Sequence, residues 1–319
     1  MDRSPHGTVF HYSWWLDISA ERFQILAARD RSGTLVAGIP LPMRRRAGLS
    51  LFHSPNLTPY LGPVFDLQGA GGVCDQLFRM RSYGEMLASR ISGFDSFRCF
   101  VGARGPDLQG FLWAGFRIEL AYTFRIPSTQ SMPSVAEQIT RTHSQKLNKA
   151  RRLGLCVTRN EGPGAFEALC QMNRQRHIDP LYSQEISRGL WLAAAERGKA
   201  DLYLARTPEG LPSAALLTVH DSRATYQIVS GFEESLENVQ GSYLVLWQAL
   251  NDALNEGRDF DFEGSSLRGV EQFYRRWGAA AVPVWRITKV DSWRGRFLQQ
   301  LIDRRDAKRR SVSATQRNA

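Results

Sequence analysis

Alternating apolar and polar positions predict two β-hairpins, one near the start of each half of the chain. Strands 24–28 and 34–41 form the first, strands 202–206 and 213–219 form the second, and each pair is joined by a short turn that ends in glycine. Aligned without gaps, the two hairpins are identical at four positions. Because each hairpin heads a comparable half of the chain, the pattern indicates a duplicated α/β domain.

Helical and strand patterns alternate through the rest of the second half. In order, we expect helices at 163–176 and 183–197, a helix carrying Leu246 to Leu254, a strand at 259–263, a helix that ends at Gly278 and a strand at 282–289. Such alternation is typical of an α/β sheet covered by helices.

The best candidate for a domain boundary is the Ser/Thr/Pro-rich stretch 127–133, which separates the apolar strand 120–126 from a helical pattern. We expect that helix to begin near Ser134, with Glu137 completing a Ser-x-x-Glu capping box. The sequence therefore predicts a first domain over residues 1–133, a second domain over 134–290 and a disordered basic tail over 311–319.

Positive charge is concentrated in two segments of a chain whose formal net charge is +10. Residues 141–159 contain six basic side chains and no acid, and residues 293–319 contain eight basic side chains against Asp303 and Asp306. The remainder of the chain is close to neutral. Two such blocks favour contact with phosphate groups, either on a nucleic acid or on a phosphorylated small molecule.

The composition, with 43% hydrophobic and 23% charged residues among 319, is that of a globular protein large enough for two domains. No window is long and apolar enough for a transmembrane helix, and the N-terminus has no apolar signal core, so we expect a cytoplasmic protein. The four cysteines and six histidines lack the spacing of metal ligands, so no metal site is predicted. The sequence also contains no GxSxG nucleophile elbow, dinucleotide fingerprint or phosphate-binding P-loop.

Three acidic residues alternate along the strand 259–263 and would share one face of it. Asp261 and Glu263 lie nearest to its C-terminal end, where open α/β sheets commonly bind ligands. One hypothesis is that Asp261 or Glu263 receives the amine of a nucleophilic substrate, by orienting it or by taking its proton. The alternative is an ion-paired strand end that faces Arg268, Arg275 or Arg276.

Several motifs in a fixed order resemble those of the FemABX-like transferases. In the second half these are Asn238 to Leu250, then Phe260-Asp261-Phe262-Glu263-Gly264-Ser265, then Phe273-Tyr274-Arg275-Arg276-Trp277-Gly278. The strand 225–231, the basic stretch 141–155 and Tyr60-Leu61-Gly62-Pro63 are similar to further segments of the family. The resemblance covers roughly residues 10 to 290.

This resemblance implies an α/β chain of two tandem GNAT-like (acyl-CoA N-acyltransferase-type) domains, each a mixed sheet covered by helices, with a C-terminal helix at 291–310 packed on the first. It implies an acyltransferase that moves an aminoacyl group from aminoacyl-tRNA to an amine acceptor, either a small molecule or a peptidoglycan-precursor-like compound. The alternatives are an N-acyltransferase that uses acyl-CoA, and a non-catalytic Fem-like protein that binds RNA or a partner. Because the donor is a co-substrate, no tightly bound cofactor is expected.

The donor loop separates the first two of these possibilities. In ordinary GNAT enzymes a loop of the form [QR]-x-x-G-x-[GA] presents backbone N–H groups to the CoA pyrophosphate. Here the aligned residues are Asn238, Gly241 and Tyr243, so the glycine fits but the bulky Tyr243 would hold a pyrophosphate at a distance. This departure favours aminoacyl-tRNA, whose many phosphate contacts the two basic segments also fit. The same segments would fit the diphosphate of a nucleotide-sugar or lipid-linked acceptor.

The resemblance also assigns candidate site residues in three groups. The catalytic group would be Asp261, Glu263 and Arg275, with Arg275 standing where family members often carry Lys. The substrate would be contacted by Tyr60, Tyr226, Ser265 and Tyr274, with buried packing as the alternative for Tyr60 and Tyr226. The phosphates of the donor would be bound by Arg141, His143, Lys146, Arg151, Arg152, Gly241 and Ser242.

Overall fold

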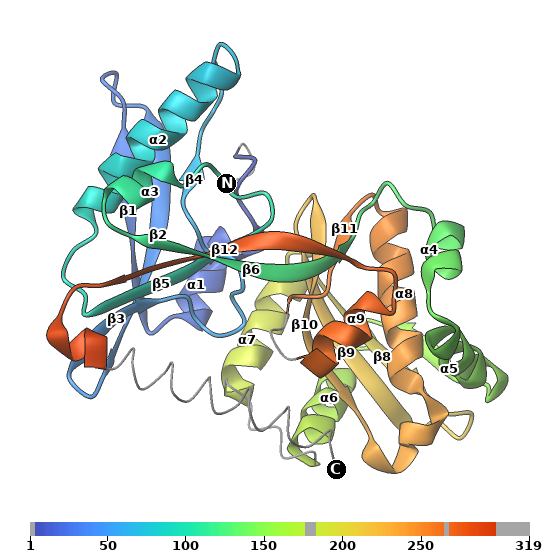
Figure 1. Cartoon of the computed structure of the whole chain (residues 1–319). Helices are drawn as coiled ribbons and strands as arrows, with labels where there is room; N and C mark the ends of the chain where they lie inside the picture. The colour runs from blue at the N-terminus through green and yellow to red at the C-terminus, as the bar shows by residue number, and fades with distance from the viewer. Residues whose placement is uncertain (1–3, 176–182, 265–267, 298–319) are drawn as a thin grey trace. The chain divides into compact units, whose positions relative to one another are not determined.

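The computed structural model describes residues 4–175, 183–264 and 268–297, and the chain divides into two compact units (Figure 1). The first unit is Met1–Tyr122 with Pro283–Ala319, and the second is Thr123–Val282. The chain passes from one unit to the other within strand β6 (Arg117–Ile126) and again within strand β12 (Ala280–Val290). The sequence predicted the first boundary within 127–133, whereas the two units divide inside the strand that precedes this stretch.

The first unit contains a mixed sheet with the strand order β1-β2-β3-β5-β12, in which β3 and β5 run parallel and the other described pairs are antiparallel. The strands are β1 (Arg22–Arg29), β2 (Leu35–Arg46), β3 (Leu49–His53) and β5 (Ser96–Val101), with the short β4 (Val64–Phe65) beside β2. The first predicted hairpin is confirmed by the antiparallel β1–β2 pair, whose turn includes Gly33 at a φ of 85°.

Two helices of the first unit, α2 (Val73–Arg90) and α3 (Gln109–Trp113), share a core with its sheet. They cross closely at a pair of glycines, because a Cβ on Gly110 would stand 2.4 Å from the backbone oxygen of Arg81. A short 3-10 helix η1 (Val9–His11) and helix α1 (Ser13–Ser19) precede the sheet.

The C-terminal segment begins directly after β12, where the Ser292 hydroxyl donates a hydrogen bond to Asp95 at 2.5 Å within the first unit. The described residues end at 297, so most of the predicted helix 291–310 and the predicted tail 311–319 lie outside them.

The second unit contains strands in the order β6-β11-β10-β9-β8-β7, with β10 and β11 parallel and the other described pairs antiparallel. The strands are β7 (Cys156–Arg159), β8 (Ala200–Arg206), β9 (Pro212–His220), β10 (Ala224–Phe232) and β11 (Asp259–Asp261). The second predicted hairpin is confirmed by β8 and β9.

The helix that the sequence predicted near Ser134 is two helices in the structure. Helix α4 (Met132–Gln138) is capped by the Ser131 hydroxyl, which accepts a hydrogen bond from the Ser134 N–H at 3.4 Å, and helix α5 (Arg141–Arg152) follows. The predicted capping box at Ser134 is therefore corrected to a cap three residues earlier, because Pro133 fits the first turn of a helix.

The remaining helices cover the two faces of the second sheet. They are α6 (Pro163–Gln175), α7 (Gln184–Ala195), the 3-10 helix η2 (Glu234–Val239), α8 (Gly241–Asn255) and α9 (Arg268–Arg275). Helix α8 packs on the face that includes Ala214 and Leu216 of β9. Helix α6 lies on the other face, where a Cβ on Gly231 would stand 3.1 Å from Leu169. Since neighbouring residues of a strand point to opposite faces, the two helices cover opposite sides of β9 and β10.

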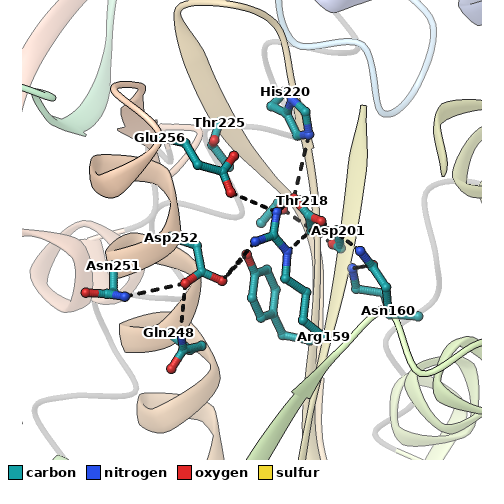
Figure 2. Close-up of polar contacts among 12 residues, drawn as sticks. Arg159, Asn160, Asp201, Thr218, His220, Thr225, Gln248, Asn251, Asp252 and Glu256 are labelled. Atoms are coloured by element: carbon teal, nitrogen blue, oxygen red, sulfur yellow. Dashed lines mark hydrogen bonds and ion pairs between the residues drawn. The ribbon is translucent and has the colours of Figure 1, made fainter. Parts of the chain in front are cut away.

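An ion-pair network joins the outer strand β7 to the C-terminal end of α8 (Figure 2). The Arg159 guanidinium donates to both carboxylate oxygens of Asp201, at 2.8 and 2.9 Å, and also reaches Asp252 and Glu256. The Tyr203 hydroxyl donates to Asp252 at 3.1 Å. These carboxylates come from β8 and α8, so one arginine fixes the sheet edge to the helix that covers it.

Candidate functional site

A cavity of about 430 Å³ opens in the second unit where β10, the start of α8 and helix α9 meet. Its wall combines hydroxyl and amide groups with aromatic rings, and Lys146 of α5 is the one basic side chain among the described residues that line it. Other residues that line the cavity include Ser213, Gln227, Ser230, Gly241, Ser242, Tyr243, Phe273 and Tyr274. A volume of this size is in the range of small-molecule sites.

The N-terminus of α8 faces this cavity through Gln240, Gly241 and Ser242. Gln240 has a left-handed backbone with φ of 64°, no side chain caps the helix, and its first turn contains no acid. The glycine is required by packing, because a Cβ at Gly241 would stand 2.3 Å from the Ser213 hydroxyl oxygen. An uncapped helix start favours anions, which suits a phosphate or carboxylate at this edge of the cavity, and the acidic Glu237 lines the same cavity.

Helix α5 supplies the basic surface beside the cavity. Its buried residues His143, Leu147 and Ala150 recur with helical spacing, which leaves Arg141 and Arg152 exposed. Lys146 lies between these two sides of the helix, and its ammonium donates to the Tyr243 hydroxyl at 3.1 Å.

Two residues of α5 that were predicted to bind the donor phosphates, Arg151 and His143, contact aromatic rings of the protein itself. Arg151 stacks over the Trp247 ring at 5.3 Å. His143 is 2% exposed, lies among the rings of Tyr243, Phe273 and Trp277, and has a pKa lowered to about 4, mainly by burial. A neutral, enclosed imidazole cannot contact a donor phosphate, so this environment corrects the prediction for His143.

Asp261 is fully buried and its carboxylate is occupied by groups of its own unit. It accepts hydrogen bonds from the Thr123 hydroxyl at 2.5 Å, from Arg125 at 2.7 Å and from the Glu263 N–H at 2.9 Å. Arg125 is itself 7% exposed, so the two residues form a buried ion pair. The strand end is ion-paired, as one of the two sequence hypotheses held, but its partner is Arg125 rather than the arginines near 270.

Glu263 differs from Asp261 in both backbone and side chain. Its φ of 52° lies in the left-handed region, and its Oε1 is buried without a hydrogen-bond partner among residues 4–175, 183–264 and 268–297. Burial and the neighbouring Asp261 charge raise the pKa of Glu263 well above its usual value. Burial and the charges of Glu263 and Asp261 also raise the pKa of Tyr274, which lines the cavity. Strained residues with a perturbed carboxyl group are typical of functional sites.

Strands β10 and β11 separate next to this carboxyl group. Their pairing ends at Tyr226 and Asp261, while β10 continues to Phe232. A bulge at Ile228 interrupts the register of β10 with β9, so this residue has no partner in that strand pair. Bulges of this kind re-aim backbone groups and are frequent beside active sites.

The two tyrosines predicted to contact substrate are buried in packing positions. Tyr60 is 4% exposed and covers Gly102, where a Cβ would stand 3.2 Å from its ring. Tyr226 is 3% exposed, and its hydroxyl donates to Asp221 at 2.9 Å. Neither ring has a surface to offer an acceptor, which corrects both predictions.

The remaining predicted site residues differ in their positions relative to the cavity. Tyr274, Gly241 and Ser242 line the cavity together with Lys146. Arg275 has a side chain that is 62% exposed and pairs with Glu271 one helical turn away. Ser265 lies outside the described residues.

Several residues that form or support the site were not predicted from the sequence. Arg125 and Thr123 precede Asp261 by more than 130 positions, and no local pattern links them. Gln227 and Ser230 line the cavity from β10, and the polar interruption they make in an otherwise apolar strand was the available signal.

The described part of the chain contains neither a metal-binding cluster nor a membrane-spanning helix. No group of three or more His, Cys, Asp or Glu residues there could hold a metal ion. No helix in the same residues has the length and apolar character needed to span a membrane.

Comparisons with known proteins agree with this architecture. Residues 138–276 match a family model described as an acetyltransferase (GNAT) domain. A crystal structure of FemX is similar with a TM-score of 0.66 at 14% identity, covering 94% of this chain and 95% of that one. L-PGS from Bacillus licheniformis gives 0.53 at 10% identity, covering 93% and 92%. A tandem GNAT protein from the clavulanic acid biosynthesis pathway gives 0.50 at 11% identity, covering 87% and 86%.

No curated protein matches the sequence at a significant level. The matched structures confirm the predicted fold, an α/β chain of tandem GNAT type.

Proposed function

We propose, from a tandem GNAT fold whose second unit carries the matched acetyltransferase domain, that this unit is an amide-forming acyltransferase. One observation carries the proposal. A cavity that begins at an uncapped helix N-terminus is lined by Tyr274, whose pKa is raised by burial and by the charges of Glu263 and Asp261. The Oε1 of Glu263 is buried and has no hydrogen-bond partner among the described residues. The anion-binding end would hold the donor, and the carboxyl group would handle the nucleophile.

In the proposed reaction the nitrogen of an acceptor amine attacks the carbonyl carbon of an activated acyl group. A C–N bond forms, the C–O bond of an aminoacyl ester or the C–S bond of a thioester breaks, and the leaving oxygen or sulfur takes up a proton. The amine loses one proton, for which we assign Glu263 as the base, and its raised pKa makes it a stronger base than an ordinary carboxylate. Asp261 would act as a positioning residue, since it accepts the Glu263 N–H and thereby fixes the turn.

The carbonyl oxygen gains negative charge as the amine attacks, and a preorganised donor would stabilise it. The bulge at Ile228 supplies backbone groups released from the strand register at the point where β10 leaves β11. We assign this role to the bulge rather than to Arg275, because the Arg275 side chain is exposed and paired with Glu271.

For the donor we propose aminoacyl-tRNA. The support is the exposed basic side of α5, which lies beside the cavity and continues the charge of Lys146 with Arg141, Lys149 and Arg152. Such a surface fits several phosphates of a polynucleotide, each contributing to a salt-dependent affinity. The FemABX-like resemblance of the motifs implies the same donor and an amine acceptor of the peptidoglycan-precursor type or a small molecule.

Acyl-CoA is the second candidate, and a specific observation favours it. The sequence suggested that Tyr243 would keep a pyrophosphate away from the α8 N-terminus, yet its side chain is 7% exposed, packs in the core of the second unit and accepts a hydrogen bond from Lys146 at the cavity wall. The helix start therefore stays open to a diphosphate, with Lys146 close by.

The test measures transfer to a panel of amines from charged tRNA and, separately, from acetyl-CoA. Glu263→Gln should lower kcat by roughly 10²–10⁴ with the true donor. Glu185→Gln, an exposed glutamate of α7, is the matched control and should keep wild-type turnover. If Glu263→Gln stays within a few-fold of wild type, the base assignment is refuted.

The donor is identified by a second pair of variants on the exposed side of α5. Arg141→Ser with Arg152→Ser should weaken binding of tRNA and reduce the slope of its salt dependence by about two, one for each lost phosphate contact. The same variants should leave the KM for acetyl-CoA unchanged. Salt-dependent RNA binding without product from either donor would instead support the non-catalytic, RNA-binding alternative.

A further inference from the structure

A second, smaller cavity of about 140 Å³ lies in the same unit between α6, α7 and β10. Its floor is apolar and is built from Phe166, Leu169 and Val229, with the Phe166 ring stacked on Trp191 at 4.9 Å. The reaction proposed above leaves this cavity without a role. An apolar cavity of about 150 Å³ accepts a molecule the size of benzene, so the space fits about six carbon atoms.

The two cavities are adjacent across strand β10, because Ser230 lines both. Gln227 and Phe232 line the larger cavity, whereas Ile228 and Val229 line the smaller one. The bulge at Ile228 lies at this junction, next to the point where β10 leaves β11. The pairing of β10 with β11 has ended at this point, which would allow a ligand in the larger cavity to extend an apolar end toward α6.

The cavity lining also contains polar residues, which are Asn173, Arg174, Gln184, Ser187 and Ser230. Asn173 of α6 lines the cavity, and its Oδ1 is buried without a hydrogen-bond partner among the described residues. This oxygen can accept only from an N–H or O–H group. At the rim, Arg174 donates to Gln184 at 2.8 Å. The lining thus suits an apolar group that carries or adjoins one hydrogen-bond donor.

We propose that this second cavity binds the apolar end of the group that the enzyme transfers, and so selects acyl or aminoacyl groups with a tail of about six carbons. This inference rests on the proposed function of the second unit. The reacting carbonyl would lie at the junction near Ser230, the donor body would occupy the larger cavity, and the tail would pass to Phe166 and Leu169.

The acceptor amine is a poorer occupant of the same space. None of the described residues that line the smaller cavity is acidic, and Arg174 would repel an ammonium group. Glu263, to which we assign the amine, lines neither cavity; it follows β11, whose pairing with β10 ends beside the bulge at Ile228. In the proposal the amine approaches the carbonyl from the β11 side, and the tail lies toward α6.

The first experiment measures occupancy directly through Cys170, which lines the smaller cavity. In the full chain with Cys74→Ser and Cys156→Ser, which remove the exposed thiols, Cys170 is modified by methyl methanethiosulfonate and the rate is followed by mass spectrometry. Burial raises the pKa of the Cys170 thiol, so the reaction is run at alkaline pH. Hexanamide and phenylacetamide should slow the modification, whereas acetamide should not.

Val229→Phe and Ser187→Met each add side-chain volume to the cavity, one from β10 and the other from α7. If one variant does not fold, the other still tests the proposal. Both should abolish protection by hexanamide. Leu192→Met, an exposed position of the same helix as Ser187, is the control and should retain it. Equal rates with and without hexanamide in the parent protein would overturn the proposal.

The second experiment compares kcat/KM for short and long acyl donors, acetyl against hexanoyl or glycyl against leucyl. The long group should be preferred by at least about tenfold, and Val229→Phe should remove the preference by lowering kcat/KM for the long donor more than for the short one. Equal use of both groups would overturn this inference while leaving the acyltransferase proposal intact. Protection of Cys170 without turnover from any donor would refute the acyltransferase proposal and would retain only the binding of an apolar group in the cavity.

Discussion

The buried ion pair between Arg125 and Asp261 offers the sharpest test of how the second unit holds its site. Arg125 is replaced by Met, which keeps the length of the stem and removes the guanidinium. Asp261 is then left fully buried with two of its donors, the Thr123 hydroxyl and the Glu263 N–H, and without the two contacts at 2.7 Å from Arg125.

Leaving one member of a buried pair uncompensated costs about 3–5 kcal/mol. Against a total stability of about 5–15 kcal/mol, this is a large share. Asp261→Asn should cost less, about 1.5–3 kcal/mol, because it removes a charged hydrogen bond but leaves Arg125 near Asp259 at 3.9 Å. The double variant should lose less than the sum of the two, with a coupling energy of about 0.5–3 kcal/mol.

The assay is urea unfolding followed by tryptophan fluorescence, with the free energy of unfolding taken from each transition. The matched control is the surface pair of Arg188 and Glu167, which is 2.9 Å long but about half exposed at both ends. Arg188→Met should cost no more than about 1 kcal/mol, because solvent screens such a pair. If Arg125→Met cost as little as Arg188→Met, the claim that the pair stabilises the strand end would be refuted.

Three further predictions follow from the same unit. Gly241→Ala should destabilise the protein by about 1–3 kcal/mol in urea unfolding, since its Cβ meets the Ser213 hydroxyl at 2.3 Å, and Ser213→Ala should restore part of the loss if the clash is the cause. Arg159→Met should lower the midpoint of thermal unfolding by leaving Asp201, which is 3% exposed, without its bidentate partner, and an unchanged midpoint would contradict this role. Burial lowers the pKa of His143 to about 4, so the unfolded chain binds a proton that the folded one does not, and stability should fall as pH drops from about 6.5 to 4. His143→Phe should flatten that part of the stability curve, and an unchanged slope would argue against a buried neutral imidazole.

Elements with a local signal were predictable from the sequence. The two hairpins, the apolar face of α8 and the strand after Gly257 each follow from the spacing of side chains within about fifteen residues. The duplication visible in the hairpins pointed to the tandem fold for the same reason. The cap of α4 was misplaced because Ser131 and Ser134 give similar local signals, and packing of the adjoining chain decides between them.

The candidate site depended on contacts that no local pattern contains. The sequence identified Asp261 and Glu263 as carboxylates at a strand end but could not separate their roles. The structure separates them by giving Asp261 an arginine from a strand more than 130 residues earlier and by turning Glu263 through a left-handed backbone. Tyr60, Tyr226 and His143 also could not be assigned from the sequence. Their polar groups were predicted to be accessible, but the folded chain buries all three residues.

By itself, then, the sequence determined the kind of chain: a duplicated α/β protein with its positive charge on one helix of the second unit and in the C-terminal segment. Those properties are set by the order of apolar, polar and charged residues along neighbouring turns and strands. Only the tertiary structure decided which acid is neutralised, which helix start is open and where two cavities meet at Ser230. These features depend on exclusion of water and on distances between segments remote in the chain, and both come into existence only when the sheet and its helices pack together.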